Sequence, residues 1–177
     1  SAIHNPGFYG TTKFLGEKLV QTFSEKVTTI AIRLPGIVGP NLPAGRPWLH
    51  TIAKKLQLGE DVEYYNPKSL FNNICDLWTI SDFIIHLTTR TNLQRCGTVN
   101  LAASEPIQLH RVIDLMRERL NSSSKITKQK TNKTSFTIET GIVENEYDYL
   151  PATTTEMATR FVDDSFFHIN NRQKDDP

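Results

Sequence analysis

The chain contains 177 residues, of which 38% are hydrophobic and 22% are charged, and its 20 basic side chains nearly balance 19 acidic ones for a net charge of +1. This composition is typical of an ordinary globular protein and excludes a disordered chain, a collagen and a disulfide-rich scaffold. The near-neutral charge argues against a protein that mainly binds nucleic acid, and no apolar run approaches the roughly 20 residues that span a bilayer.

The cysteine content and the first residues give an expectation about the compartment. Cys75 and Cys96 are too few for a disulfide framework and lack C-x-x-C spacing. The first ten residues carry polar residues and a proline where a signal peptide would have an apolar segment. We therefore expect reduced thiols and a cytoplasmic protein. Because the sequence starts at Ser1 and enters a helical pattern almost at once, we interpret it as a fragment of a longer protein.

The first two predicted elements are a helix and a strand. Residues 9–24 carry apolar side chains four positions apart, which is the spacing of an amphipathic helix with one stripe against a core. That stripe contains Leu15, Leu19 and Phe23. Residues 27–34 are rich in β-branched side chains and end at Pro35, which predicts a strand. Its mostly apolar run favours a parallel sheet covered on both faces, followed by a loop over residues 36–43.

The rest of the chain alternates short strands with helices. Strands are predicted at residues 62–65, 72–77 and 98–101. Helices are predicted at 47–58, from Thr79 or Ser81 onward, at 106–120 with Ser104 as N-cap, and after Thr153, which begins a capping-box sequence with Glu156. Residues 121–134 are polar and show no clear period. This alternation predicts an α/β fold.

One pair of side chains suggests acid–base chemistry. Tyr9 and Lys13 are four residues apart on the first predicted helix and so share a face. A nearby ammonium favours the deprotonated form of a phenol, and such a phenol can exchange a proton with an alcohol or carbonyl. Tyr64 and Lys68 have the same spacing, but Pro67 makes a helix unfavourable there. The alternative for the first pair is a solvated lysine beside a half-buried tyrosine.

The wider sequence resembles a known family. The run YGTTKFLGEKLV, followed by IAIRLPGIVGPNLP, is similar to the extended short-chain dehydrogenase/reductases, the NAD-dependent epimerase/dehydratases. Glu17 and Arg33 match positions of that pattern, and the segments FNNICDLWTISDFI, TVNLA and IQLHRVIDLM follow in the family's order. The resemblance covers most of the chain.

The resemblance implies the C-terminal part of a Rossmann-type parallel sheet with a small substrate-binding α/β subdomain. Residues 1–45 would end the NAD(P)-binding domain and carry the Tyr-x-x-x-Lys helix. Residues 46–170 would form the substrate-binding part, interleaved with closing elements of the sheet, and residues 171–177 a tail.

The resemblance also implies roles for individual residues. Tyr9 would be the general acid/base, and Lys13 would bind the nicotinamide ribose. Pro35, Gly36 and Ile37 would place backbone against the nicotinamide end of NAD or NADP. The intact enzyme would then transfer hydride between the cofactor and a small sugar-like substrate, with a nucleotide sugar as the usual example. A homodimer through the Tyr–Lys helix is a further expectation, and neither nucleic acid nor a membrane is expected as a partner.

Departures from the family pattern keep alternatives open. The chain has no glycine-rich phosphate-binding motif, so the pyrophosphate of a dinucleotide would bind outside these residues. Asn72 and Trp78, the candidate substrate-binding residues, stand where the family often has an arginine and an acid. Asn72 cannot supply the charge that meets a diphosphate. A truncated non-catalytic remnant and a generic α/β binding module are therefore the alternatives.

The histidines and the tryptophans are two further groups of candidate residues. The five histidines lack metal-binding spacing, so no metal site is predicted. Trp48 and Trp78 have aromatic faces that stack on sugars or bases, against the more frequent alternative of core packing.

Overall fold

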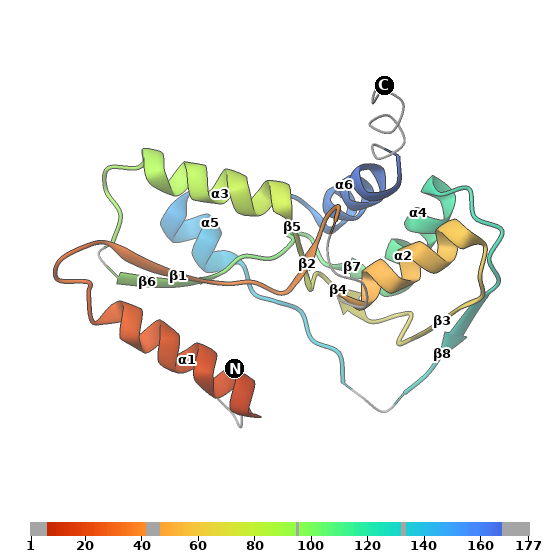
Figure 1. Cartoon of the computed structure of the whole chain (residues 1–177), viewed down its shortest axis with the longest axis horizontal. Helices are drawn as coiled ribbons and strands as arrows, with labels where there is room; N and C mark the ends of the chain where they lie inside the picture. Colours follow the sequence, from red (N-terminus) through yellow and green to blue (C-terminus); the bar gives the residue numbers. More distant parts are fainter. Residues whose placement is uncertain (1–6, 42–46, 95, 132–133, 168–177) are drawn as a thin grey trace, which may run out of the picture.

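The structure is a computed structural model that describes residues 7–41, 47–94, 96–131 and 134–167. Figure 1 shows an elongated arrangement of helices and short strands. The helices are α1 (Gly7–Gln21), α2 (Trp48–Leu58), α3 (Leu77–Thr89), α4 (Leu109–Arg119), α5 (Gly141–Tyr147) and α6 (Thr154–Phe166). The strands are β1 (Thr29–Arg33), β2 (Gly36–Val38), β3 (Val62–Tyr65), β4 (Leu70–Phe71), β5 (Ile74–Asp76), β6 (Cys96–Asn100), β7 (Ile107–Gln108) and β8 (Ile126–Gln129).

The strands form two-stranded sheets that are mostly parallel. The pairs β1–β6, β2–β5 and β3–β8 are parallel, and β4–β7 is antiparallel. In the first pair Thr29 lies opposite Cys96 and Arg33 opposite Asn100, so the carboxyl ends of β1 and β6 lie together. Parallel pairs need crossover connections that carry helices. This topology confirms the predicted α/β fold.

The core is built where α2, α4 and α6 meet the central strands. Along α4 the buried side chains follow the spacing i, i+3, i+4 and i+7, as the sequence predicted. They are Leu109, Val112, Ile113 and Met116. Phe161 of α6 and Leu49 of α2 are also buried. A second part of the same core lies under α3, where Phe83 contacts the rings of Tyr147 and Tyr149.

The predicted start of α4 was wrong, because the residues just before Leu109 form strand β7 instead. α4 begins at Leu109 with Gln108 at its N-cap. Ile107 instead pairs with Phe71 across β4 and β7. The hydroxyl of Ser104 does not cap this helix but donates to the carbonyl oxygen of Pro151 at 2.7 Å.

Other boundaries also differ from the sequence prediction. Residues 36–38 form β2 instead of a loop, because they pair with β5. α3 begins at Leu77 after the N-cap Asp76, earlier than the predicted start at Thr79 or Ser81. Strand β8 and helix α5 were not predicted. The capping box that opens α6 is confirmed, with Thr153 and Glu156 bonded reciprocally. The expected tail, residues 171–177, lies outside the described residues.

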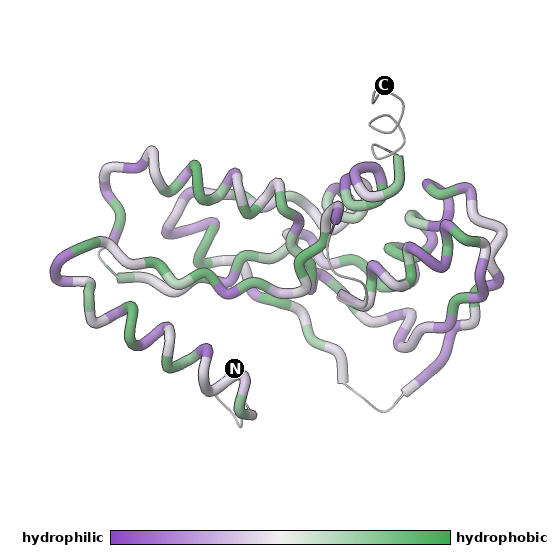
Figure 2. The backbone as a smooth tube through the Cα atoms, viewed as in Figure 1, coloured by the Kyte–Doolittle hydropathy of each residue, from purple (hydrophilic) through white to green (hydrophobic). Residues whose placement is uncertain are grey.

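Helix α1 is present, but its apolar stripe does not face a core. None of the side chains of α1 is buried, and Leu15 and Leu19 are 60% and 64% exposed. Figure 1 shows α1 below the β1–β6 pair, with α3 and α5 above it. Figure 2 shows apolar and polar residues alternating along α1. The face of α1 that contacts β1 and β6 carries Glu17 and Gln21, whereas Leu15 and Leu19 lie on another face, so the predicted burial was wrong for this chain.

Among the described helices, none combines the length and the apolar character that crossing a bilayer requires.

We predict that the ring of Phe83 is a major contributor to stability. Phe83 is fully buried, so Phe83→Ala should lower the free energy of unfolding by about 3–5 kcal/mol because it leaves a cavity. Phe8→Ala is the matched control, since Phe8 is 88% exposed and its loss should change stability by less than about 0.5 kcal/mol. Urea unfolding monitored by circular dichroism measures both. Equal effects of the two substitutions would contradict the assigned core.

Candidate active site

Two side-chain contacts define how α1 lies on the sheet. The Arg33 guanidinium donates two hydrogen bonds to the Glu17 carboxylate, at 2.8 Å and 2.7 Å. The Gln21 amide donates to the Thr98 hydroxyl at 3.1 Å, and Thr98 lies opposite Ala31 in the β1–β6 pair. Gln21 therefore lies beside the middle of β1, and Glu17, which comes earlier in the chain, lies beside the end of β1 at Arg33. α1 thus runs antiparallel to β1.

This direction carries the Tyr–Lys pair past the carboxyl end of β1. At 1.5 Å per residue, Lys13 lies about 6 Å and Tyr9 about 12 Å beyond Glu17 along the helix axis. Ligands in open α/β sheets bind beyond the carboxyl ends of the strands. Tyr9 is 73% exposed, and the Lys13 ammonium lies 5.4 Å from the centroid of its ring. The structure thus brings the two predicted residues together on an open face.

The hydrogen-bonded contact between Glu17 and Arg33 favours the charged form of both side chains. The hydrogen bond from Arg33 lowers the pKa of Glu17, and the same bond raises the pKa of Arg33. Both groups therefore stay charged at neutral pH. The side chains are 17% and 34% exposed, respectively. Since exposed ion pairs stabilise proteins by about 1 kcal/mol or less, the main consequence of this bidentate pair is geometric.

The predicted cofactor-contacting turn follows β1 directly. Pro35 precedes β2, which begins with Gly36 and Ile37, and Gly36 pairs with Ile74 of β5. A Cβ atom on Gly36 would lie only 3.2 Å from the Cβ atom of Pro47. The absence of a side chain at Gly36 thus lets the chain before α2 approach this turn. Whether the turn contacts a nicotinamide ring stays a prediction.

A pocket of about 450 Å³ opens between α2 and β3. Its lining includes Trp48, Lys55, Tyr64 and Tyr65. Trp48 directly follows Pro47, whose side chain lies beside Gly36. The sequence suggested Trp48 as a cleft residue but did not predict the pocket, because the packing of α2 against β3 and Leu109 is a tertiary contact that no local pattern shows.

Tyr64 has an unusual position in the lining of this pocket. The residue is only 3% exposed, and its hydroxyl has no hydrogen-bond partner in the described part of the chain. Burial raises the pKa of Tyr64 to about 12, and the nearby charge of Asp114 acts in the same direction. The phenol therefore keeps its proton at neutral pH and has a hydrogen-bond donor that the described chain does not use.

The two predicted substrate-binding residues lie elsewhere. Asn72 is 1% exposed, and its amide nitrogen donates to the carbonyl oxygens of Ala103 (3.0 Å) and Ile138 (2.8 Å). These bonds use both amide hydrogens of Asn72. Trp78 is 61% exposed, and its indole N–H donates to Asp164 at 2.7 Å. It lines a different pocket, of about 540 Å³, beside Arg160. A substrate contact by either residue stays a prediction.

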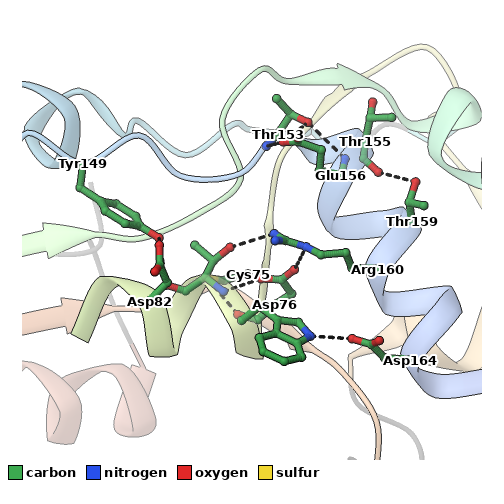
Figure 3. Close-up of polar contacts among 12 residues, drawn as sticks. Cys75, Asp76, Asp82, Tyr149, Thr153, Thr155, Glu156, Thr159, Arg160 and Asp164 are labelled. Carbon is green, nitrogen blue, oxygen red and sulfur yellow. Dashed lines mark hydrogen bonds and ion pairs between the residues drawn. The ribbon is translucent and has the colours of Figure 1, made fainter. Parts of the chain in front are cut away.

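Polar contacts fasten α6 to the start of α3 (Figure 3). Asp76 is 2% exposed, and its carboxylate accepts from the backbone N–H of Thr79 and pairs with Arg160, both at 2.8 Å. The Tyr149 hydroxyl donates to Asp82 at 3.0 Å, and burial with this bond raises the pKa of Tyr149. These groups satisfy one another, so we assign them a structural role.

Within the ranges that the structure describes, no three His, Cys, Asp or Glu side chains gather as a metal site would require.

Comparison with known proteins identifies the fold. No family model matches the chain, and no curated protein matches it. Solved structures do match. An epimerase from Methanothermobacter thermautotrophicus has a TM-score of 0.74 at 14% identity, over 94% of this chain and 52% of its own. A UDP-glucose 4-epimerase from Thermotoga maritima, solved with UDP-glucose, has a TM-score of 0.71 at 12% identity, over 92% of this chain and 54% of its own.

A third match is a dTDP-glucose 4,6-dehydratase from Bacillus anthracis in complex with NAD, with a TM-score of 0.70 at 12% identity, over 94% of this chain and 53% of its own. The chain thus spans about half the length of these solved structures, and it aligns with their C-terminal portion. The chain has the fold of the C-terminal portion of a Rossmann-type epimerase. In this epimerase-type fold, α1, β1 and the turn after β1 are the elements that carry the candidate site.

We predict that the buried hydroxyl of Tyr64 does not stabilise the free protein. Tyr64→Phe should leave the free energy of unfolding unchanged or raise it, because the substitution removes an unpaired buried polar group. The control is Tyr149→Phe, which removes a hydroxyl bonded to Asp82 and should cost about 1 kcal/mol. Urea unfolding of both variants is the measurement. A larger loss for Tyr64→Phe than for Tyr149→Phe would show that the Tyr64 hydroxyl has a partner within the protein.

Proposed function

We propose that the chain is the C-terminal half of an NAD(P)-dependent epimerase, dehydratase or reductase of the extended short-chain dehydrogenase/reductase family. The observation that carries the proposal is the placement of Tyr9 and Lys13. They lie together on an exposed face of α1, and α1 is antiparallel to β1, so that both project past the carboxyl end of that strand. The epimerase-type fold supports the same conclusion.

The residues present fit the nicotinamide end of the cofactor. Lys13 offers an exposed ammonium for ribose hydroxyls, and the turn at Pro35 directly follows the carboxyl end of β1. The pyrophosphate would be held by a glycine-rich turn outside this sequence. NAD or NADP, when bound, supplies or accepts the hydride.

The proton chemistry belongs to Tyr9 in this proposal. The phenol would exchange a proton with the oxygen on the substrate carbon that changes oxidation state. Lys13 would hold the ribose, which orients the cofactor relative to Tyr9.

The substrate proposed is a sugar linked to an aromatic base. The pocket between α2 and β3 presents the aromatic faces of Trp48 and Tyr65, which suit a flat ring, and Lys55 can meet an anionic group. The solved structure from Thermotoga maritima contains UDP-glucose, which is a molecule of this chemical class.

We predict that both residues of the pair are needed for turnover by the full-length protein. Tyr9→Phe removes the proton donor and should lower kcat by about 10²–10⁴-fold with a nucleotide sugar and NAD or NADP. Lys13→Met should lower kcat and also raise the KM for the cofactor, because it removes a ribose contact. Steady-state kinetics with absorbance of the reduced nicotinamide, or product analysis for an epimerase, measures both.

The chain contains its own control for this test. Tyr64 and Lys68 repeat the Tyr-x-x-x-Lys spacing outside any helix, and Lys68 is exposed. Lys68→Met should therefore leave kcat and both KM values unchanged. Equal turnover by wild type and Tyr9→Phe would contradict the proposal. A wild type that neither binds the cofactor nor turns over substrate would favour a non-catalytic α/β module.

A further inference from the structure

We propose that Glu17 and Arg33 are positioning residues, whose ion pair sets the place of the Tyr–Lys helix relative to the turn that follows β1. This inference rests on the proposed function for its catalytic consequence, but the geometric part can be tested without turnover. The contact between Glu17 and Arg33 includes none of the reacting groups. It joins α1, which carries Tyr9 and Lys13, to the end of β1, which precedes the turn at Pro35.

The first argument is that packing does not fix α1. None of its side chains is buried, and the largest apolar ones on its stripe are more than half exposed. A helix held by a buried stripe has one place to lie because its side chains interdigitate with a core. In this half of the fold α1 has no fully buried side chain, although Phe14 is partly buried, so the contacts of Glu17 with Arg33 and of Gln21 with Thr98 are specific bonds that join it to the strands.

The second argument is the geometry of the contact. The two bonds from Arg33 to Glu17 leave from different guanidinium nitrogens and end on different carboxylate oxygens, at 2.8 Å and 2.7 Å. Such a bidentate pair fixes an orientation as well as a distance. A single bond, such as that of Gln21 to Thr98, leaves a helix free to pivot about it.

The third argument is the location of the pair. Arg33 is the last residue of β1 and lies two positions before Pro35, whereas Glu17 lies one helical turn from Lys13. Gln21 and Thr98 hold the helix a further turn away from the site. Of these two contacts, that of Glu17 is therefore the one nearer to Tyr9 and Lys13.

A kinetic test uses the full-length protein. Glu17→Gln keeps the size of the side chain but removes its charge, and Arg33→Lys keeps the charge but removes the planar bidentate geometry. Each should lower kcat by about 10–100-fold, the loss expected when a catalytic group is displaced by about 1 Å. The KM for substrate should not change. Exchange of the two charges, Glu17→Arg with Arg33→Glu, should recover part of kcat.

The matched control is a second bidentate pair in the same chain. Arg119 of α4 donates two bonds of 2.6 Å to Asp163 of α6, away from α1. Arg119→Lys disturbs an equivalent contact and should leave kcat unchanged. If Arg119→Lys lowered kcat as much as Arg33→Lys, the effect would be one of general stability and the proposal would be overturned.

A distance measurement separates this inference from the proposed function. Nitroxide labels at Thr12→Cys in α1 and Gln57→Cys in α2, with Cys75 and Cys96 replaced by alanine, report the place of the helix by pulsed electron paramagnetic resonance. The distance distribution should broaden with Glu17→Gln and stay unchanged with Arg119→Lys. An unchanged distribution with Glu17→Gln overturns the positioning role. If Glu17→Gln broadens the distribution but the wild type shows no turnover, the positioning role is supported and the proposed function is contradicted.

Discussion

The bidentate contact between Arg33 and Glu17 is the interaction on which the candidate site depends. In this half of the fold α1 has no fully buried side chain, and Leu15 and Leu19 on its apolar stripe are exposed. The ion pair and the neighbouring bond from Gln21 to Thr98 hold the helix antiparallel to β1 instead. The direction in which α1 carries Tyr9 and Lys13 follows from these two contacts.

The rest of the molecule is held by different forces. α2, α4 and α6 meet around fully buried apolar side chains such as Leu49, Met116 and Phe161. α6 is also fastened to α3 through the buried carboxylate of Asp76 and its partner Arg160. The pocket between α2 and β3 therefore lies on a well-packed part, whereas the Tyr–Lys pair lies on a helix fixed by polar contacts. The proposed reaction would need both parts in one arrangement.

The sequence predicted those features that depend on neighbours along the chain. The helical spacing of α4, the capping box at Thr153 and the closeness of Tyr9 to Lys13 all follow from local geometry, and the structure has each of them. Features that depend on distant partners were missed. Residues 36–38 form β2 because they pair with β5, and Ile107 is not part of α4 because it pairs with Phe71.

The same distinction applies to the candidate site. Asn72 was singled out by its place in a motif, but no local pattern shows that its amide bonds to residues 103 and 138. The pocket beside Trp48 requires α2 to pack against β3, with Leu109 added from a segment more than 40 positions further along the chain. The exposed stripe of α1 could not be foreseen either, because an amphipathic pattern indicates that a helix has an apolar face and not whether anything covers it.

The central claim is that α1 carries Tyr9 and Lys13 to the cofactor beyond the carboxyl end of β1. A crystal structure of the full-length protein with NAD or NADP tests it most directly. We predict that the Lys13 ammonium lies within hydrogen-bond distance of the nicotinamide ribose and that the Tyr9 hydroxyl faces the nicotinamide ring. A cofactor bound with its nicotinamide away from α1, or a protein that does not bind the cofactor at all, would contradict the account.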